Sequence, residues 1–544
     1  MAIFLANLVK RIEDSNTSFY LWVFSFLGII ALRVLMENWL GGMINRTGDY
    51  FFHHVSYTFV FFLLSYLIFL VLIIKNLKIE IKKASNVLLW GYLIIIFPPL
   101  IDFILLRDRA YLSFYGIYGL AEMPKRFVTF FGDSPDFGIT YGVRFEIAVT
   151  VLALLVYGYL KTKSPVKALS LALQSYVILF ILGTFPSWVT IISQGFSKGF
   201  MQIGDLEIVK LFFTSARLFS RETGTYLNAL SIKLSLIYAT MLAGLIIGGL
   251  FLSYRDKFVV FLKNSRPVQI IYHLGLLLLG GVLGIIFTKF NWDFNIFNFF
   301  GFLNISIAVI LAWLASVVFN DIYDERIDLV TNPRRPLAVK DFSQTEYVTI
   351  GVVLFVFSIF YATLVNPKVA FLLIAYQLLA WVYSAWPFRL KRFPLVATLI
   401  SALASLLIIF SGFILVSPAE DILEFPKRIF WLVLIALIFS LPIKDLKDIK
   451  GDKLDKVNTI PVIFGEYWGK IIIGSGIFMS YFLSVVFLNE YALTFWAIVV
   501  GGASFGVVVF SGRNKRINNY NLIWWILGLV VIYLLIMIKI IFLR

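Results

Sequence analysis

Cysteine is absent from the 544 residues, and histidine occurs only three times, at His53, His54 and His273. The lack of thiols excludes disulfide bonds, iron–sulfur clusters and thiolate zinc sites. Three imidazoles in the whole chain also argue against a metal centre built from histidine. The chemistry of this protein must therefore be sought in other side chains.

Charged residues are also scarce, at 14% of the chain, whereas 60% of the residues are hydrophobic. A soluble core does not need that much apolar surface. Apolar runs such as 59–74 and 303–319, with their apolar flanks, approach the roughly 20 residues that cross a bilayer as a helix. Because these runs lack the alternation of barrel strands, the sequence predicts an all-α polytopic membrane protein.

The apolar runs predict about fifteen transmembrane helices in two groups. Six lie in the first half, near residues 17–36, 55–74, 87–106, 139–160, 168–192 and 227–253. Nine follow, near residues 267–288, 297–319, 346–365, 368–385, 395–416, 428–444, 469–488, 491–511 and 521–543. A basic, partly amphipathic connector, 253–267, separates the two groups. We therefore predict a six-helix membrane domain at 1–252 and a nine-helix membrane domain at 253–544.

The formal net charge of +16 is interpreted as loop charge that orients the helices, and not as a sign of nucleic-acid binding. Basic clusters at 75–83, 161–167 and 444–456 fall on one predicted side of the membrane. The short loop 417–425 on the opposite side is acidic. The positive-inside rule thus predicts an integral protein of the cytoplasmic membrane, with its N-terminus in the cytosol and its C-terminus outside.

The stretch NDIYDERID, residues 320–328, places three aspartates at the end of an apolar run. Asn320, Asp324 and Asp328 recur at every fourth residue. Asp321 is the residue after Asn320, so on a helix it lies beside this series. On a helix, residues spaced by four lie along one face. Three carboxylates so close repel one another in their ionised forms, so the pattern predicts a ladder of oxygen ligands for a cation.

A second acidic stretch, KDLKDIKGD at 444–452, also follows an apolar span. It carries Asp445, Asp448 and Asp452 and lies on the same predicted side of the membrane as the first stretch. Two sets of oxygen ligands suit a hard cation. Mg²⁺ fits best, because it binds through a few carboxylates, waters and substrate phosphates. Magnesium is therefore the predicted cofactor.

Hydroxyl and basic side chains end the fourth predicted span of the second half, in VYSAWPFRLKR at 382–392. They are Tyr383, Ser384, Arg389, Lys391 and Arg392. Arg334 lies just beyond the first acidic stretch. Cations of this kind, next to carboxylate-held Mg²⁺, suit a pyrophosphate group. A lipid tail attached to that group would run into the bilayer between the helices.

These three stretches resemble those of the UbiA superfamily of intramembrane prenyltransferases. That family carries N-D-x-x-D-x-x-x-D after its second helix, a Tyr-Ser and basic cluster after its fourth, and D-x-x-D-x-x-x-D after its sixth. NDIYDERID, YSAWPFRLKR and DLKDIKGD stand in the same order here, among nine predicted spans. NPRRPL (332–337) and VNTIPVIFG (457–465) also resemble the family. The resemblance covers about residues 255–544, and the first half is not recognised.

The resemblance implies a Mg²⁺-dependent enzyme that moves a prenyl group from a polyprenyl diphosphate to an acceptor and releases pyrophosphate. The catalytic candidates that it implies are Asp324, Asp448, Lys391 and Tyr383. The metal candidates are Asn320, Asp321, Asp324, Asp328, Asp445, Asp448 and Asp452. The candidates for binding the diphosphate are Asn320, Arg389, Lys391, Arg392, Ser384, Arg266 and Arg334. Candidates to shield an allylic cation are Trp386, Tyr376 and Trp381.

The acceptor stays open among aromatic precursors of quinones, tetrapyrroles and glycerol phosphate lipids, which the family uses, and we favour an aromatic or quinone-type acceptor. The expected partners are this acceptor, the prenyl diphosphate and membrane lipid. The role and the protein partner of residues 1–252 stay open, and the long loop 107–138 fits a binding loop and a packed cap equally well. An alternative hypothesis makes the protein a transporter or a prenyl-lipid-binding scaffold whose first half carries the function. That alternative predicts a pseudo-symmetric repeat, for which we find no sequence support.

Overall fold

The computed structural model describes the chain with short gaps, over residues 2–41, 48–106, 116–117, 119–132, 139–200, 203, 205–289, 295–325, 328–329, 335–454, 457–512, 517–519 and 521–542. Within these ranges, fifteen helical segments are long and apolar enough to cross a membrane. Six of them lie before residue 254 and nine lie after residue 266. The predicted class, an all-α polytopic membrane protein, and the predicted number of spans are confirmed.

Packing separates the chain into two units. The first comprises Met1–Ala216 and Glu222–Gly249, and the second comprises Arg217–Arg221 and Leu250–Arg544. The elements of the first unit are α1 (Ala2–Glu13), α2 (Phe19–Leu40), α3 (Gly48–Leu77), α4 (Ile81–Gly91), η1 (Tyr92–Ile96), α5 (Pro98–Leu106), α6 (Glu122–Val128), α7 (Tyr141–Thr162), α8 (Pro165–Gly183), α9 (Phe185–Lys198) and η3 (Val209–Phe213). At the division in sequence lie β1 (Arg217–Leu218), β2 (Arg221–Glu222) and α10 (Tyr226–Ser253). Parts of the predicted loop 107–138 lie outside the described residues.

Two predicted spans of the first unit are interrupted at proline. The span predicted at 87–106 consists of α4, the short helix η1 and α5, with Pro98 at the start of α5. The span predicted at 168–192 ends with α8 at Gly183, and α9 restarts with Pro186 in its first turn. Proline has no N–H to donate to the preceding turn, so a continuous helix ends there.

The second unit carries the remaining helices. They are α11 (Arg255–Asn264), α12 (Pro267–Thr288), α13 (Ile296–Tyr323), α15 (Gln344–Val365), α16 (Pro367–Ser384), η4 (Leu390–Arg392), α17 (Pro394–Val416), η5 (Ile422–Glu424), α18 (Lys427–Ser440), η6 (Leu441–Lys447), α19 (Ile449–Leu454), α20 (Ile460–Leu488), η7 (Tyr491–Leu493), α21 (Thr494–Val509) and α22 (Leu522–Phe542). Proline in the first turn begins α12, α16 and α17, at Pro267, Pro367 and Pro394. A first-turn N–H has no partner within the helix, so proline is well tolerated there.

Helices α12 and α17 pack closely because glycines face the partner backbone. A Cβ on Gly280 of α12 would overlap the carbonyl oxygen of Ile409 on α17. A Cβ on Gly412 of α17 would in turn overlap the carbonyl oxygen of Leu277 on α12. Small residues at such a crossing let two membrane helices approach at backbone distance. The position of α12 against the rest of the bundle therefore depends on these glycines.

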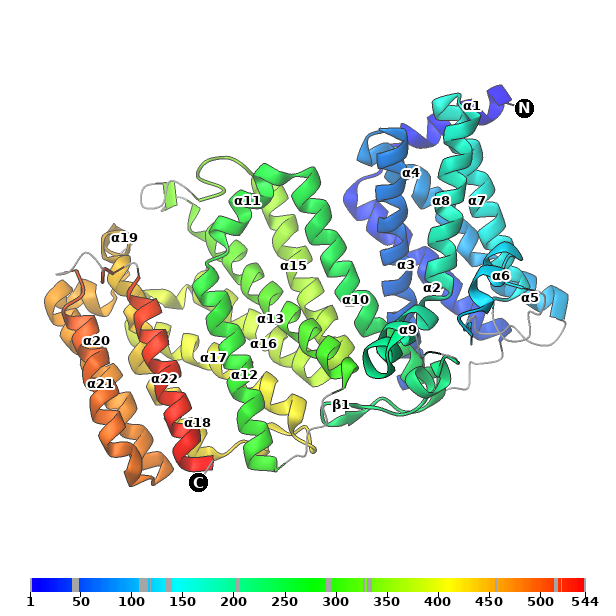
Figure 1. The fold of residues 1–544 in the computed structure, drawn as a ribbon. Helices are drawn as coiled ribbons and strands as arrows, with labels where there is room; N and C mark the ends of the chain where they lie inside the picture. Colours follow the sequence, from blue (N-terminus) through cyan, green and yellow to red (C-terminus); the bar gives the residue numbers. More distant parts are fainter. Residues whose placement is uncertain are drawn as a thin grey trace. The chain divides into compact units, whose positions relative to one another are not determined.

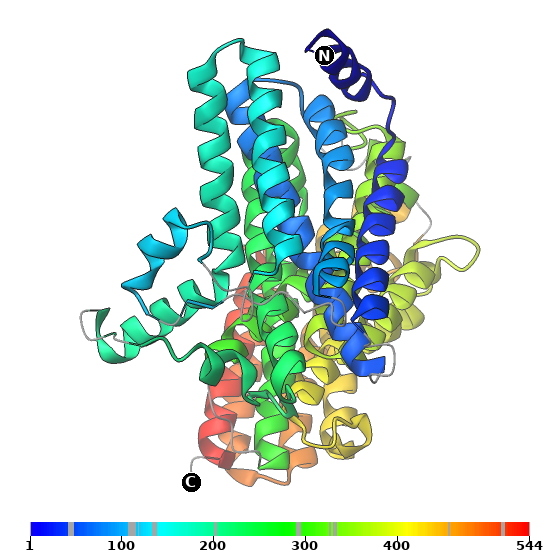
Figure 2. The same ribbon diagram turned by 90° about the vertical axis from the view of Figure 1, so that its right-hand side faces the viewer.

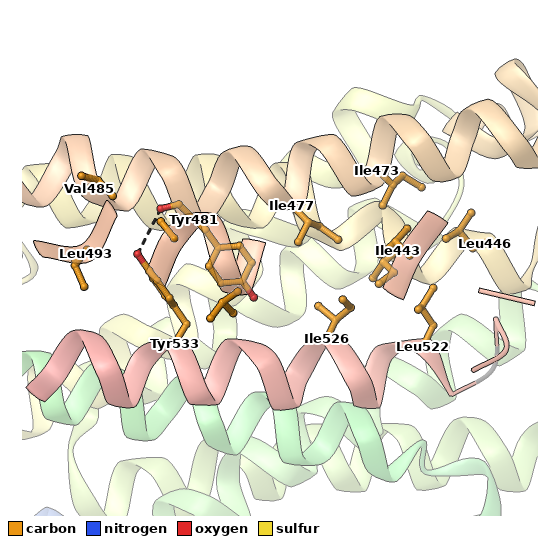
Figure 3. Close-up of a cluster of buried hydrophobic side chains, with 13 residues drawn as sticks. Ile443, Leu446, Ile473, Ile477, Tyr481, Val485, Leu493, Leu522, Ile526 and Tyr533 are labelled. Atoms are coloured by element: carbon orange, nitrogen blue, oxygen red, sulfur yellow. Dashed lines mark hydrogen bonds between the residues drawn. The ribbon is translucent and has the colours of Figure 1, made fainter. Parts of the chain in front are cut away.

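A cluster of buried apolar side chains joins α20, α21 and α22 to η6 (Figure 3). The rings of Tyr481 on α20 and Tyr533 on α22 meet edge to face, with 4.9 Å between their centroids. Ile443 and Leu446 bring η6 into the same cluster. Since Asp445 lies between these two residues, the cluster also fixes the start of the second acidic stretch.

Helices α11 and α19 lie at the upper end of the second unit in Figure 1, and the C-terminus lies at its lower end. The view turned by 90° also places the C-terminus at the lower end (Figure 2). Asn264, at the end of α11, contacts Asp321 near the end of α13, and α19 follows the sixth span of this unit. Both acidic stretches therefore lie at the end of the unit opposite to the C-terminus of α22.

Candidate active site

The first acidic stretch is not the straight helical ladder that its spacing predicts. Helix α13 carries Asn320 and Asp321 and ends at Tyr323, and Asp324 is its C-terminal cap, with φ −101° and ψ 5°. Asp328 therefore lies beyond this helix. The N–H of Asp324 still donates to the carbonyl oxygen of Asn320 at 3.0 Å, and the N–H of Asp328 donates to that of Asp324 at 2.9 Å. The predicted straight helix is thus interrupted at Asp324, but the four-residue hydrogen-bond spacing that joins Asn320, Asp324 and Asp328 is kept.

Asp321 binds four donors instead of facing open space. Its Oδ2 accepts from the amide of Asn264 at 2.5 Å and from the hydroxyl of Tyr347 at 3.2 Å. Its Oδ1 accepts from Arg266 at 3.2 Å and also from Arg335. The residue is only 1% exposed. The structure thus places this predicted metal ligand at a junction of α11, α12, α13 and α15.

Asp324 contacts two cations from the segment after α16. Lys391 donates to both carboxylate oxygens, and Arg389 donates to one of them at 3.1 Å. Arg389 is buried behind this contact. The guanidinium of Arg392 turns elsewhere and lies over the ring of Trp386, 4.5 Å from its centroid. Lys391 also lines a large cavity of this unit, whereas Arg389 and Arg392 do not.

The two hydroxyl side chains predicted for the site, Ser384 and Tyr383, form hydrogen bonds with residues of α13 and η6. Ser384 donates to the side-chain oxygen of Asn320 at 2.9 Å. Lys444 donates to the hydroxyl of Tyr383 at 3.1 Å and to that of Ser401 at 3.3 Å. Sequence reasoning counted Lys444 only as loop charge and missed this contact. The position of Lys444 directly before Asp445 in the sequence could have indicated that it belongs to the site.

The second acidic stretch is also divided between elements. Asp445 lies on η6, Asp448 caps it, and Asp452 lies on α19. Thr459 donates to Asp452 at 3.3 Å. Burial, with Asp445 and Asp448 close by, raises the pKa of Asp452 to about 7. Because burial and like charges disfavour a carboxylate that lacks a counter-cation, this arrangement favours binding of a cation.

One cavity of about 1420 Å³ brings the two acidic stretches together. The predicted site residues that line it are Arg266, Asn320, Asp324, Asp328, Tyr383, Ser384, Lys391, Asp445, Asp448 and Asp452. The predicted residues Asp321, Arg389 and Arg392 do not line it, and Arg334 lies outside the described residues. Arg335, the neighbour of Arg334 in sequence, lines the cavity and forms an ion pair with Asp328 at 3.6 Å.

The cavity continues from this charged end into the apolar interior. Both Glu466 and Leu488 of α20 line it, and 22 residues of helix span about 33 Å. That length is comparable with the hydrocarbon thickness of a bilayer. Of the aromatic residues proposed to shield a cation, Tyr376 lines the cavity, whereas Trp381 and Trp386 do not.

The donor set fits Mg²⁺ in chemistry, because carboxylate and amide oxygens from two stretches share one cavity. Among the described residues, no three acidic or histidine side chains lie close enough to hold one ion together. Lys391 and Arg335 instead neutralise Asp324 and Asp328. Binding of Mg²⁺ at these oxygens would therefore have to open the two ion pairs.

Comparison with known proteins identifies a family for the second half of the chain. Residues 278–521 match the UbiA prenyltransferase family. The C-terminal half is a UbiA prenyltransferase family domain. The chain is 30% identical over 204 residues to the "Probable homogentisate phytyltransferase 2, chloroplastic" of Oryza sativa subsp. japonica. This match covers 36% of the chain and 52% of that protein, so the chain spans about half the length of this curated relative.

Two solved structures are also similar to about half of the chain. A UbiA homolog from Archaeoglobus fulgidus, bound to GPP and Mg²⁺, has 18% identity and a TM-score of 0.39, over 51% of this chain and 96% of that one. A UbiA homolog from Aeropyrum pernix K1 has 18% identity and a TM-score of 0.38, over 49% of this chain and 98% of that one.

Proposed function

We propose that the UbiA domain transfers a prenyl group from a polyprenyl diphosphate to an acceptor, releases pyrophosphate and requires Mg²⁺. The observation that carries this proposal is the two-part cavity. Its charged end holds carboxylates from both acidic stretches together with Lys391, and the rest of its wall runs along α20 through the apolar interior. A diphosphate head with a long apolar tail is complementary to both parts at once.

The charged end offers cations and hydroxyl groups for a diphosphate. Lys391 and Arg335 would exchange their carboxylate partners for phosphate oxygens, and Arg266 lines the same end. Ser384 would add a hydroxyl donor. Mg²⁺ would be held by Asn320, Asp324, Asp328, Asp445, Asp448 and Asp452, and when bound it would neutralise the charge that develops on the leaving pyrophosphate.

The acceptor that we propose is a hydroxylated aromatic compound. In the reaction, the allylic C1–O bond of the donor breaks as a ring carbon of the acceptor bonds to C1. The ring then loses one proton, and the electron pair of the broken bond leaves with pyrophosphate. The name of the rice relative, a probable homogentisate phytyltransferase, supports this class of acceptor.

We further propose that the charged end of the cavity faces the cytosol, together with the N-terminus, and that the C-terminus lies outside. The dense basic charge around 389–392 and 444–456 supports this orientation. The position of the C-terminus of α22, at the opposite end of the unit, is compatible with it. Residues 1–252 would form a separate membrane domain.

The decisive experiment uses membranes that contain the full chain, ³²P-labelled or ³H-labelled geranylgeranyl and phytyl diphosphates, and homogentisate within a pool of hydroxylated benzoates. Pyrophosphate release and the extracted prenylated product would be followed with and without Mg²⁺. A labelled product that is lost in Asp324→Ala is the expected result. If correctly inserted protein released no pyrophosphate from either donor, the proposal would be wrong.

A further inference from the structure

His273 and Tyr376 form a hydrogen-bonded pair inside the cavity of the UbiA domain, away from its carboxylates. His273 lies on α12 and Tyr376 on α16, and both line the cavity. The hydroxyl of Tyr376 is 3.0 Å from Nε2 of His273. The two residues are 6% and 4% exposed. The proposed donor chemistry uses neither of them.

The contacts of the imidazole determine the direction of this hydrogen bond. Nδ1 of His273 lies 2.6 Å from the carbonyl oxygen of Gln269, which can only accept a hydrogen bond. Nδ1 therefore carries the hydrogen, and in the neutral ring Nε2 is an acceptor. Tyr376 must then donate to Nε2. The ring of Trp313, 4.7 Å away between centroids, packs against the imidazole and helps to hold its orientation.

This geometry prepares the oxygen of Tyr376 to accept a further hydrogen bond. A phenol that donates its only hydrogen keeps two lone pairs, and donation to the imidazole increases the negative charge on its oxygen. Ser316, which also lines the cavity, donates its hydroxyl hydrogen to the carbonyl oxygen of Trp313 at 2.7 Å. The pair itself bears no positive charge. It thus suits a neutral hydroxyl group better than a carboxylate or a phosphate.

The depth of the pair fits an aromatic acceptor. Tyr376 lies eight residues before Ser384 on α16, which is about 12 Å along a helix. His273 lies six residues after Pro267 on α12, or about 9 Å. A compound with its hydroxyl group at Tyr376 would therefore direct its ring toward the charged end, where C1 of the donor would lie.

A purely structural role accounts for this pair less well. Two helices in a membrane can pack without polar groups, and buried polar side chains there cost free energy unless they are satisfied. Apolar side chains could take the place of His273 and Tyr376 at little cost if they only packed α12 on α16. The pair instead lies in the wall of a cavity, where a ligand can reach it.

We propose that Tyr376 binds the hydroxyl group of an aromatic acceptor and that His273 positions and polarises Tyr376 for this contact. The inference rests on the proposed function and names the acceptor site within it. Tyr376 would contact the substrate directly, whereas His273 would act through Tyr376 and is a positioning residue.

The test uses the full chain in membranes, with homogentisate as the acceptor probe and geranylgeranyl diphosphate as the donor. Tyr376→Phe and His273→Phe each remove the hydrogen bond, and His273→Phe keeps a ring against Trp313. We expect the KM for homogentisate to rise roughly tenfold in both, as the loss of one hydrogen bond implies, with the donor KM within about twofold of native. His273→Gln, whose side-chain oxygen can accept from Tyr376, should recover part of the loss.

Tyr361→Phe is the matched control. Tyr361 is also a buried tyrosine of the UbiA domain, on α15, but it does not line the cavity. This variant should keep both KM values near native. A native homogentisate KM in Tyr376→Phe and His273→Phe would overturn the inference. An equal rise of the donor KM would also overturn it, because it would indicate a general distortion of the cavity.

A further comparison separates this inference from the proposed function. Binding of geranylgeranyl diphosphate to the native protein would be measured in the presence of Mg²⁺ and without an acceptor. If the donor binds but is not transferred to any hydroxylated aromatic compound, the proposed acceptor site is wrong, whereas the proposed donor site is supported. Absence of donor binding would overturn both proposals.

Discussion

Lys391 and Asp324 are in direct contact, and the ammonium group of Lys391 donates to both carboxylate oxygens of Asp324. The two residues are 67 positions apart in sequence and line the same cavity. In this state the carboxylate has a counter-ion from the protein itself. Binding of a diphosphate with Mg²⁺ would separate the pair and give each partner a new ion of opposite charge.

Replacement of Asp324 by alanine should therefore remove most of the prenyl transfer. We expect a loss of at least about 100-fold in turnover, comparable with the loss of other groups that stabilise developing charge. Turnover would be measured from labelled product, at equal amounts of inserted protein. Asp341→Ala changes an exposed aspartate that follows the same stretch and is the matched control. Near-native transfer in Asp324→Ala would contradict the role of this carboxylate.

The contacts of Asp321 predict a different outcome from those of Asp324. Asp321→Asn should lower the stability of the protein by about 3 kcal/mol, because it disrupts a buried ion pair with Arg266 and Arg335. The concentration of Mg²⁺ needed for half-maximal transfer should change little. Thermal unfolding in detergent and a magnesium titration would measure the two effects. Unchanged stability with a weakened response to Mg²⁺ would instead support Asp321 as a metal ligand.

The crossing of α12 and α17 should not tolerate side chains at its glycines. Gly280→Ala places a methyl group against the carbonyl oxygen of Ile409, and we expect a loss of about 1–3 kcal/mol in stability from this overpacking. Gly275→Ala on the same helix is the control, because its Cβ would meet nothing within 4 Å. Thermal unfolding of both variants checks the difference. Equal unfolding temperatures would show that α12 can move to accommodate the methyl group without a loss of stability.

Removal of divalent metal should stop prenyl transfer in membranes that contain the native protein. Treatment with EDTA is expected to abolish product formation, and added Mg²⁺ should restore it, because the cavity gathers oxygen ligands from two stretches. Labelled product before chelation, after chelation and after restoration gives the measurement. Transfer that continues in excess chelator would exclude the proposed requirement for metal.

A shortened chain would test the predicted division at residue 253. A chain that begins at Ser253 should insert and keep some transfer, but it lacks Arg217–Arg221, which belongs to the second unit. In that segment the N–H of Phe219 donates to Asn298 at 2.7 Å, and the N–H of Ser220 donates to Leu415 at 3.1 Å. A chain that begins at Thr214 should therefore unfold at a higher temperature. Complete inactivity of both well-folded chains would show that the first half contributes to the site.

The fold was largely predictable because hydropathy is a local property. All fifteen spans were found, since each requires only a run of apolar residues of sufficient length. The interruptions near Pro98 and Pro186 were missed, because hydropathy does not register the loss of a backbone donor. The helical spacing at 320–328 is kept in the backbone hydrogen bonds of Asp324 and Asp328, but it does not indicate that α13 ends at Tyr323.

The site was predictable as a set of side chains but not as a set of contacts. Lys391 and most of the predicted aspartates line the cavity. Arg389 and Lys391 are two residues apart, yet one is buried behind Asp324 and the other faces the cavity. Spacing alone does not distinguish them, because η4 turns the chain between them.

The class of the protein, the order of its spans and the chemistry of its polar stretches follow from the order of residue types along the chain. The partners of Asp321, the contact between Lys444 and Tyr383 and the pair of His273 and Tyr376 do not. These contacts join helices that are distant in sequence, and they depend on how each helix is rotated and how closely it packs. A sequence pattern specifies which face of a helix is polar, but the packing of the whole bundle sets which residue that face meets.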